Sequence, residues 1–363
     1  MAYGNLNVDT VTTSTVGGVL GAGNASIMKN RIINGNFVID QRNAGASVAT
    51  SSGSSVYTLD RWKAYYSQTS KYTIQQNAGS VTKPVGFSNY LGITSSSAYS
   101  VASGDIFVLQ QLIEAYNTSD LAWGTANAKT VTLSFQVYSS LTGTFGGSIN
   151  NDTGSRSYPF SYTVSSANTW TPVSVTIAGD TTGTWNNNNN SASITLSFGL
   201  GVGSTYSGTA GSWGSTTYYS ATGATSVVGT NGATFYITGV QLEVGSSATG
   251  FEYVNYQTSL ANCQRYYENR SSSDNSLVGF CYASNNLNTP VQFLVEKRAN
   301  PTLLRYGTYT AFVNGGGNTL TYSAFNAGTR VVNINWTGGG ITAGQAFSWS
   351  SASNPQIAFD AEL

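Results

Sequence analysis

The chain has 363 residues, of which 40% are hydrophobic, 12% aromatic and only 8% charged, whereas roughly a quarter of a typical soluble domain is charged. Its 15 basic and 15 acidic side chains cancel, so it lacks the positive surface that nucleic-acid binding requires. It contains no histidine, which removes imidazole-based catalysis and the commonest zinc sites. The length predicts about two domains, each with enough apolar residues for a core.

Targeting signals and cysteines add further exclusions. The sequence has no apolar stretch of about eighteen residues and no basic segment followed by an apolar one at its start, so we expect neither membrane insertion nor a signal peptide. Cys263 and Cys281 are too few for a disulfide framework, and we expect buried or free thiols.

Residues 1–30 are small, polar and rich in glycine, without sustained periodicity. Such a segment cannot fold alone. It is either a mobile terminus or an extended arm that attaches to a partner chain or a neighbouring particle protein.

From residue 31 the pattern changes to short runs of alternating apolar and polar residues, separated by Gly, Asn, Ser and Thr. This period is typical of half-buried strands, and the turn signals between them predict an antiparallel β-sandwich over residues 31–256. The clearest runs are Thr130–Tyr138, Thr171–Ile177, Ala192–Leu200 and Thr234–Val244.

One amphipathic helix is predicted over residues 257–270. Leu260, Cys263 and Tyr267 share a face at helical spacing, and Thr258 or Ser259 could cap its start. The helix would link two domains, with the alternative that it packs three-fold about an axis.

A second, smaller β-domain is predicted over residues 271–363. Gly-rich tips at residues 314–318 and 337–340 separate its strands. The fold class is therefore all-β. The predicted strands are Leu277–Tyr282, Val291–Val295, Thr302–Phe312, Thr319–Phe325, Arg330–Trp336 and Gln356–Leu363.

Several aromatic residues in or near loops are candidates for contact with sugars, because a sugar stacks its C–H face on a ring while amides and hydroxyls bind its hydroxyl groups. Trp185, which precedes a run of five asparagines, and Trp213 are the first candidates, with Tyr218 nearby. Trp336 and Trp349, which flank the second Gly-rich tip, are further candidates. The alternative for each is that it covers an edge of the core.

Four segments carry a family resemblance. Lys29–Arg42 (KNRIINGNFVIDQR), Tyr57–Trp62 (YTLDRW), Gly239–Tyr253 and Ser259–Tyr267 (SLANCQRYY) together resemble a family of bacteriophage virion proteins, mostly tail-fibre or other appendage subunits. The resemblance covers about residues 29–270. It implies a jelly-roll sandwich similar to carbohydrate-binding modules, a homotrimer, attachment to other virion proteins through the N-terminal arm, and binding to host cell-surface polysaccharide.

The first two motifs can also be interpreted physically. Phe37 and Ile39 alternate into a core, and Trp62 should bury a large apolar area. Asp60 and Arg61 are adjacent charges in a charge-poor chain, so we expect them to make structural hydrogen bonds.

The third motif supplies a closing strand beside the opening one. Val240, Leu242 and Val244 are expected to face inward. Carbohydrate-binding jelly rolls often hold a structural calcium, and by this resemblance Asp40 and Glu243 are weak candidate ligands. Calcium takes six to eight oxygens, so two carboxylates do not define a site, and we expect no metal or other cofactor, with calcium as the alternative.

The acidic residues do not predict an enzyme, because those outside the motifs are scattered along the chain. Our main hypothesis is a structural, adhesive virion subunit, assembled in the host cytoplasm and exposed on the particle. One alternative is a capsid decoration or head-fibre protein without essential sugar binding. Another is a glycan depolymerase with a chance carboxylate pair. The acidic residues outside the motifs, from which such a pair would have to come, are Asp105, Glu114, Asp152, Asp180 and Glu268.

Overall fold

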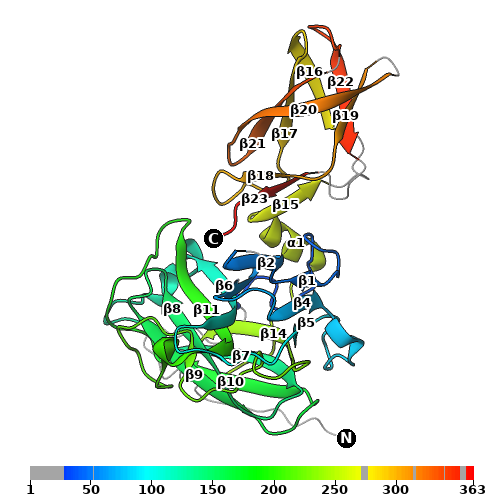
Figure 1. The fold of residues 1–363 in the computed structure, drawn as a ribbon. Helices are drawn as coiled ribbons and strands as arrows, with labels where there is room; N and C mark the ends of the chain where they lie inside the picture. Colours follow the sequence, from blue (N-terminus) through cyan, green and yellow to red (C-terminus); the bar gives the residue numbers. More distant parts are fainter. Residues whose placement is uncertain (1–27, 52, 271–276, 314–315, 339, 352–356) are drawn as a thin grey trace, which may run out of the picture.

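The computed structural model describes residues 28–51, 53–270, 277–313, 316–338, 340–351 and 357–363. They form two bodies stacked end to end, a large β-sandwich and a smaller β-domain, with the short helix α1 between them (Figure 1). The predicted all-β class, with a jelly-roll sandwich, a short helix and a second β-domain, is confirmed. The N-terminal arm lies almost entirely outside the described residues. No helix in the described ranges is long and apolar enough to cross a membrane.

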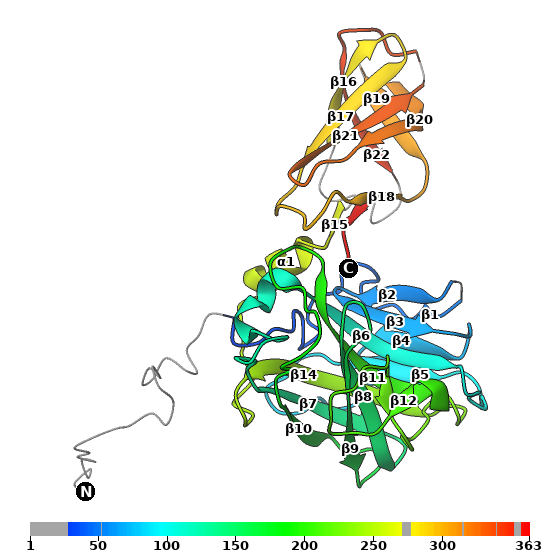
Figure 2. The same ribbon diagram turned by 90° about the vertical axis from the view of Figure 1, so that its left-hand side faces the viewer.

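The sandwich consists of two six-stranded antiparallel sheets that pack face to face (Figure 2). The first sheet has the order β1 (Val48–Ala49), β4 (Tyr72–Gln76), β5 (Leu91–Ser95), β14 (Thr234–Val244), β7 (Val131–Ser139) and β10 (Thr171–Ile177). The second has the order β2 (Ser55–Leu59), β3 (Trp62–Tyr66), β6 (Ile106–Glu114), β11 (Ala192–Val202), β8 (Gly143–Asn151) and β9 (Ser157–Val164). A short parallel pair, β12 (Ser207–Gly208) and β13 (Ser220–Ala221), lies outside them.

Alternation along the strands fills the sandwich core. On β7, Leu133, Phe135 and Val137 are buried, while Ser134 and Gln136 lie on the outer face. This follows from the two-residue period of a strand, which sends successive side chains to opposite faces. The four strands predicted in this region are confirmed, with β7 and β11 displaced or extended by one or two residues at their ends.

The motif residues mostly lie where the sequence predicts. Phe37, Ile39 and Trp62 are buried, and the backbone N–H of Arg31 donates to the Leu242 carbonyl at 2.9 Å, which places the opening segment beside the closing strand. The prediction for Val244 is wrong, because it is 41% exposed. It is the last residue of β14, where the strand leaves the sheet.

The linking helix is shorter than predicted. Helix α1 covers only Tyr256–Gln264, and its N-cap is Asn255, whose side chain accepts from the backbone N–H of Thr258 at 2.8 Å. The predicted boundaries 257–270 and the predicted caps are therefore wrong. Tyr267 does not continue the helix but begins β15 (Tyr267–Arg270), because this segment pairs with β23 (Ile357–Asp360) from the far end of the chain.

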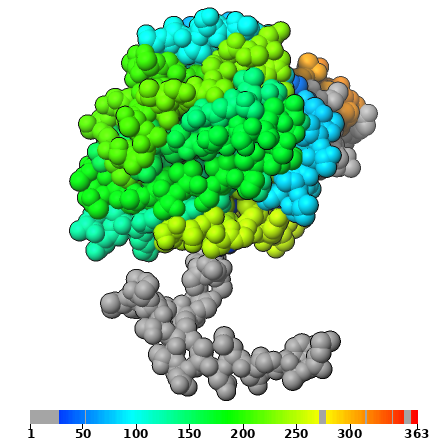
Figure 3. Space-filling view, turned by 90° about the horizontal axis from the view of Figure 1, so that it is seen from below, coloured from blue at the N-terminus to red at the C-terminus, as the bar shows by residue number. Residues whose placement is uncertain are grey.

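The C-terminal domain combines a closed barrel with a three-stranded sheet of order β15-β23-β18 (Thr302–Arg305). One predicted strand, Thr302–Phe312, is in fact two, because the chain turns at Gly307 with a positive φ of 71° and passes from β18 into the barrel. Seen from below, the sandwich hides most of this domain (Figure 3). The barrel order is β16 (Leu277–Ala283), β17 (Asn286–Gln292), β21 (Val331–Thr337), β20 (Gly316–Asn326), β19 (Tyr309–Val313) and β22 (Ala346–Ser351).

Candidate functional site

The first tryptophan candidates belong to the sandwich core. Trp185 is 8% exposed and its indole N–H donates to the Asp180 carboxylate at 3.2 Å. Its ring packs edge to face on Trp123 and Trp213, with centroids 4.8 and 5.5 Å away. Trp213 is only partly buried, but its ring also contacts Tyr158. The prediction of Trp185 as a sugar-contact residue is wrong, because the rings of Trp123 and Trp213 cover its ring. Trp213, the other first candidate, belongs to the same cluster.

The second pair of tryptophans lies inside the barrel. Trp336 and Trp349 are 1% and 0% exposed, and both indole N–H groups donate to the Thr289 hydroxyl. Their prediction as contact residues is wrong. The alternation of Val332, Ile334 and Trp336 along β21 places all three on the inner face, and this signal was present in the sequence.

The two candidate calcium ligands serve separate turns. Asp40 accepts from the backbone N–H groups of Asn43 and Gly45, and burial raises the pKa of its carboxyl group. Glu243 accepts from the backbone N–H and hydroxyl of Thr249 at 2.8 and 2.6 Å. Within the described part of the chain, no three His, Cys, Asp or Glu residues are gathered to hold a metal. Asp40 and Glu243 thus each accept hydrogen bonds within their own turns.

A different hollow lies on the outer face of the second sheet. On β3, Lys63 and Tyr65 point outward, because Trp62, Ala64 and Tyr66 between them are buried in the core. We call this hollow the outer cleft, and its volume is about 180 Å³. It is lined by Lys63, Tyr65, Gln110, Leu112, Asn150, Asn151, Asp152, Gly154, Thr195, Thr217 and Tyr219.

Side-chain amides form the floor of the outer cleft. Gln110 pairs in register with Lys63 on one side and Ser197 on the other, and its amide donates to the Ser197 hydroxyl at 2.9 Å. The Asn150 amide N–H donates to the Tyr218 carbonyl at 2.8 Å. The side-chain oxygen of Asn150 is buried and has no hydrogen-bond partner among the described residues. Because this oxygen is itself buried, it contributes to the floor below the surface that a ligand would contact.

Tyrosine rings form the wall. The Tyr219 ring lies 5.8 Å from both Tyr65 and Tyr206, tilted by 50° and 57°. Burial, together with these neighbouring phenols, raises the pKa of Tyr219, so it stays a neutral donor at physiological pH. Tyr218, the remaining predicted contact residue, is not part of the lining. Its ring packs over Gly208, where a Cβ atom would come within 2.3 Å of it.

The charges at the outer cleft do not form a catalytic pair. Burial lowers the pKa of Lys63, and the Asp152 carboxylate accepts from the Asn186 amide at 2.6 Å. Asp152 is the sole carboxylate among the described lining residues, whereas glycoside hydrolysis requires two that flank the bond. The arrangement is suited to binding, because ring faces and amides are what a sugar needs.

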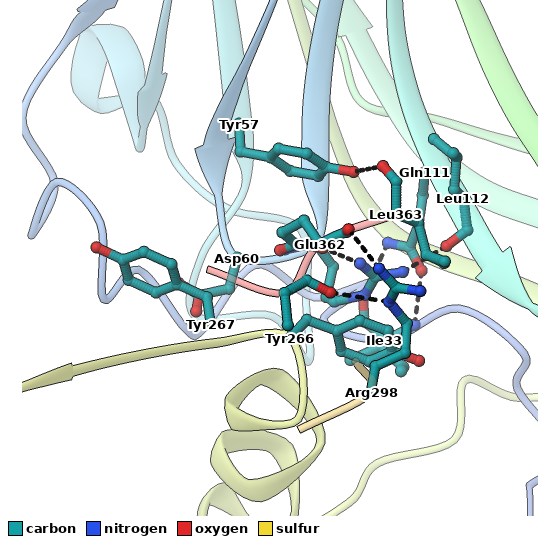
Figure 4. A network of polar contacts seen from close by, with 12 residues as sticks. Ile33, Tyr57, Asp60, Gln111, Leu112, Tyr266, Tyr267, Arg298, Glu362 and Leu363 are labelled. Carbon is teal, nitrogen blue, oxygen red and sulfur yellow. Dashed lines mark hydrogen bonds and ion pairs between the residues drawn. The ribbon is translucent and has the colours of Figure 1, made fainter. Parts of the chain in front are cut away.

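The densest group of ionisable side chains lies at the junction between the two domains (Figure 4). Glu362 is 3% exposed and forms ion pairs with Arg61 and Arg42. Arg298 donates to the main-chain carbonyl oxygens of Ala361 and Glu362, each at 2.8 Å. Tyr57 donates its hydroxyl proton to the Leu363 carbonyl at 2.5 Å, so the last residues of the chain are fixed against the sandwich.

The same junction includes two further carboxylates. Glu114 pairs with Arg265 and accepts from the Tyr266 hydroxyl at 2.6 Å. Asp60 accepts from the backbone N–H and side chain of Gln41, and burial raises its pKa to about 6. The prediction that Asp60 and Arg61 make structural contacts is confirmed. Since these groups have partners among the described residues, the junction stabilises the contact between the two domains.

The residues of the outer cleft were not predicted as site residues. The segment WKAYY carried a usable signal, since its alternation places Lys63 and Tyr65 opposite three core residues. Gln110, Asn150 and Tyr219 carried none, because they meet only through strand pairing and a long loop.

No family model matches the chain, and no curated protein matches it. Among solved structures, it is similar to the enzymatically active domain of tailspike protein 4 of bacteriophage CBA120, at 14% identity and a TM-score of 0.33, over 60% of this chain and 22% of that one. The chain thus spans about a fifth of that tailspike protein.

Two bacterial carbohydrate-binding structures are also similar to it. The family 11 carbohydrate-binding module from Clostridium thermocellum, in complex with a β-1,3-1,4-mixed-linked tetrasaccharide, shares 9% identity with a TM-score of 0.27 over 56% of this chain and 96% of the module. The N-terminal cellulose-binding domain of Cellulomonas fimi β-1,4-glucanase C shares 14% identity with a TM-score of 0.24 over 44% and 80%. Similarities of this size establish no shared activity.

Proposed function

We propose that this chain is a non-catalytic attachment protein that binds a cell-surface glycan in the outer cleft. The observation that carries the proposal is the tyrosine pair Tyr65 and Tyr219 beside the amides of Gln110 and Asn150. The rings offer faces for stacking, and the neutral phenol of Tyr219 offers a donor to a sugar hydroxyl.

We further propose that the chain acts on the surface of a bacteriophage particle, as a trimeric tail fibre or similar appendage. The resemblance of residues 29–270 to virion proteins supports this setting. The barrel adds a second support, because a ridge of exposed apolar side chains on β16 and β19 is a surface typical of protein contacts. Its members are Val278, Phe280, Tyr282 and Phe312, at 64%, 49%, 57% and 46% exposure. In the alternative that the chain is a capsid decoration protein, the ridge would make contacts with other proteins and the outer cleft would not need to bind glycan.

Glycan binding and particle position test these statements separately. The full chain should bind members of an array of bacterial surface polysaccharides, and Tyr65→Ala with Tyr219→Ala should weaken that binding by about tenfold or more. Tyr256→Ala, an exposed tyrosine at the start of α1, is the matched control. Equal binding by the double variant and the control would refute the site. Imaging of particles labelled at the C-terminal domain distinguishes tail from head, and release of reducing ends from the bound polysaccharide would refute the non-catalytic role.

A further inference from the structure

A second hollow lies on the opposite side of the sandwich, against the outer face of the first sheet. Its volume is about 370 Å³, within the range of small-molecule sites. Three aromatic side chains, Phe87, Phe251 and Tyr253, lie around it, and strands β7 and β10 contribute its floor. We call it the aromatic hollow.

The three rings form one compact group from two distant segments. The ring centroids are 5.2 Å apart for Phe87 and Phe251, 5.0 Å for Phe251 and Tyr253, and 5.9 Å for Phe87 and Tyr253. The group nevertheless remains open to solvent, since Tyr253 is 59% exposed. Phe87 and Phe251 are partly buried, so the group presents one exposed ring and the edges of two others, an apolar surface that suits a ligand or a partner.

Two glycines hold these rings in place. Strand β14 is bulged between Thr238 and Gln241, and Gly239 in the bulge has a φ of 64°. A Cβ atom at Gly239 would come within 2.6 Å of the Phe87 ring, and one at Gly86 within 2.6 Å of the Tyr253 hydroxyl. Only glycine allows both the backbone conformation and the close approach. Bulges of this kind often re-aim side chains beside binding sites.

The floor presents polar groups that are not used by the fold. Ser134 pairs in register with Ser174, and the neighbouring Gln136 pairs with Pro172. Among the described residues, the side chains of Ser134, Ser174 and Gln136 make no hydrogen bond. An amide and two hydroxyls beside open rings are therefore available to a ligand. The described lining contains no charged side chain, which favours a neutral ligand.

We infer that the aromatic hollow is a second glycan-binding site, specific for neutral saccharide units, so that one sandwich binds glycan on both faces. The ligand class follows from the proposed function, but the site shares no residue with the outer cleft. A proline-rich peptide could also stack on such rings. The saccharide is favoured because the free amide and hydroxyls are directional partners for several hydroxyl groups.

The test uses the full chain in a background that lacks the outer cleft, Tyr65→Ala with Tyr219→Ala. Cellotetraose, laminaritetraose and mannotetraose are titrated and followed by protein NMR. At least one tetrasaccharide should still bind, and adding Tyr253→Ala should weaken it by about tenfold, while Gln136→Ala weakens it less. Tyr256→Ala is the matched exposed control.

The outcomes separate the two sites. If the background variant loses all saccharide binding, the aromatic hollow is not a glycan site, although the outer cleft stands. If the background binds as the wild type does and Tyr253→Ala abolishes binding, the hollow stands and the cleft fails. Binding unaffected by Tyr253→Ala, no binding of any tetrasaccharide to the wild type, or binding of a proline-rich decapeptide alone would each overturn the inference.

Discussion

The domain junction and the outer cleft use polar residues in opposite ways. At the junction, the side chains of Glu362, Arg61 and Arg42 are charged, paired and little exposed. In the outer cleft, Tyr65 and Tyr219 are partly exposed and the Asn150 oxygen has no partner within the described structure. The chain contains only 30 acidic and basic residues, and one cluster of them joins the two domains.

This difference shows where to look for function in a charge-poor protein. A buried charge is tolerated only when it is paired and hydrogen-bonded, so a cluster of charges marks a place where the fold is fixed. Recognition of a neutral ligand needs rings and amides that remain available. Ionisable groups with shifted pKa values are often a guide to active sites, but here they mark the structural junction between the domains.

Breaking the junction should have the largest effect. Glu362→Gln removes the charge that neutralises Arg61, so we expect the free energy of unfolding to fall by about 3–5 kcal/mol, as for other buried pairs that lose one partner. Chemical denaturation of the full chain measures it.

The control is Arg330→Gln, because the Arg330 and Glu296 side chains are 80% and 48% exposed. An exposed pair of this kind contributes at most about 1 kcal/mol. Equal losses in the two variants would mean that the junction does not hold the domains together.

The pH dependence of stability sharpens the comparison further. The pKa of Asp60 is raised by burial from 3.8 to about 6, so its favourable contribution is fully present below pH 3.8 and is lost as the pH rises to 6. Asp60→Asn cannot ionise. Between pH 4 and pH 7 its stability relative to the wild type should therefore rise by about 2 kcal/mol.

Asp180→Asn provides the opposite sign. Burial acts to raise the pKa of Asp180, but hydrogen bonds from Arg156 and others leave it lowered, so this contribution is lost only as the pH falls below 3.8. Denaturation curves at pH 3 to 7 compare both variants. A flat difference for Asp60→Asn would show that Asp60 is not protonated in the folded state.

Much of the fold could be predicted from periodicity, because the alternation of apolar and polar residues along a strand shows which of its faces is buried. The alternation in Thr171–Ile177 and Thr234–Val244 located β10 and β14 without error. The segment Tyr267–Arg270 could not be predicted as a strand, since it is one only through pairing with Ile357–Asp360. That partner lies about ninety residues away in the sequence.

The candidate site was less predictable for a related reason. Loop position suggested that Trp185 was exposed, but its ring finds Trp123 and Trp213 only in the folded sandwich. Conversely, Tyr219 becomes a wall residue because its loop folds back over β3. Composition indicated which residue types would serve recognition, and three-dimensional pairing decided which individual residues do.

The reactivity of the cysteine thiols should report local opening of the junction, which is a smaller effect than the change in global stability. Cys263 and Cys281 are both free and buried, so both should react slowly in the native protein. Burial also raises the pKa of the Cys263 thiol. Glu362→Gln should speed alkylation of Cys263 by about tenfold, because Cys263 lies near this ion pair. Cys281 in the barrel should keep its rate. Mass spectrometry of the two peptides measures both, and equal acceleration would indicate global unfolding instead.

The smallest stability effect should come from the outer cleft. Tyr219 is partly exposed on a loop, so Tyr219→Ala should lower the free energy of unfolding by about 1 kcal/mol or less. Tyr72→Ala is the matched contrast, since Tyr72 is fully buried between the sheets and its loss should cost about 3–5 kcal/mol. A large loss of stability in Tyr219→Ala would mean that the ring holds its loop in place and is not free to contact a ligand. Two similar denaturation curves for Tyr219→Ala and the wild type would leave its ring free to act in recognition, which is the role that distinguishes the cleft from the junction.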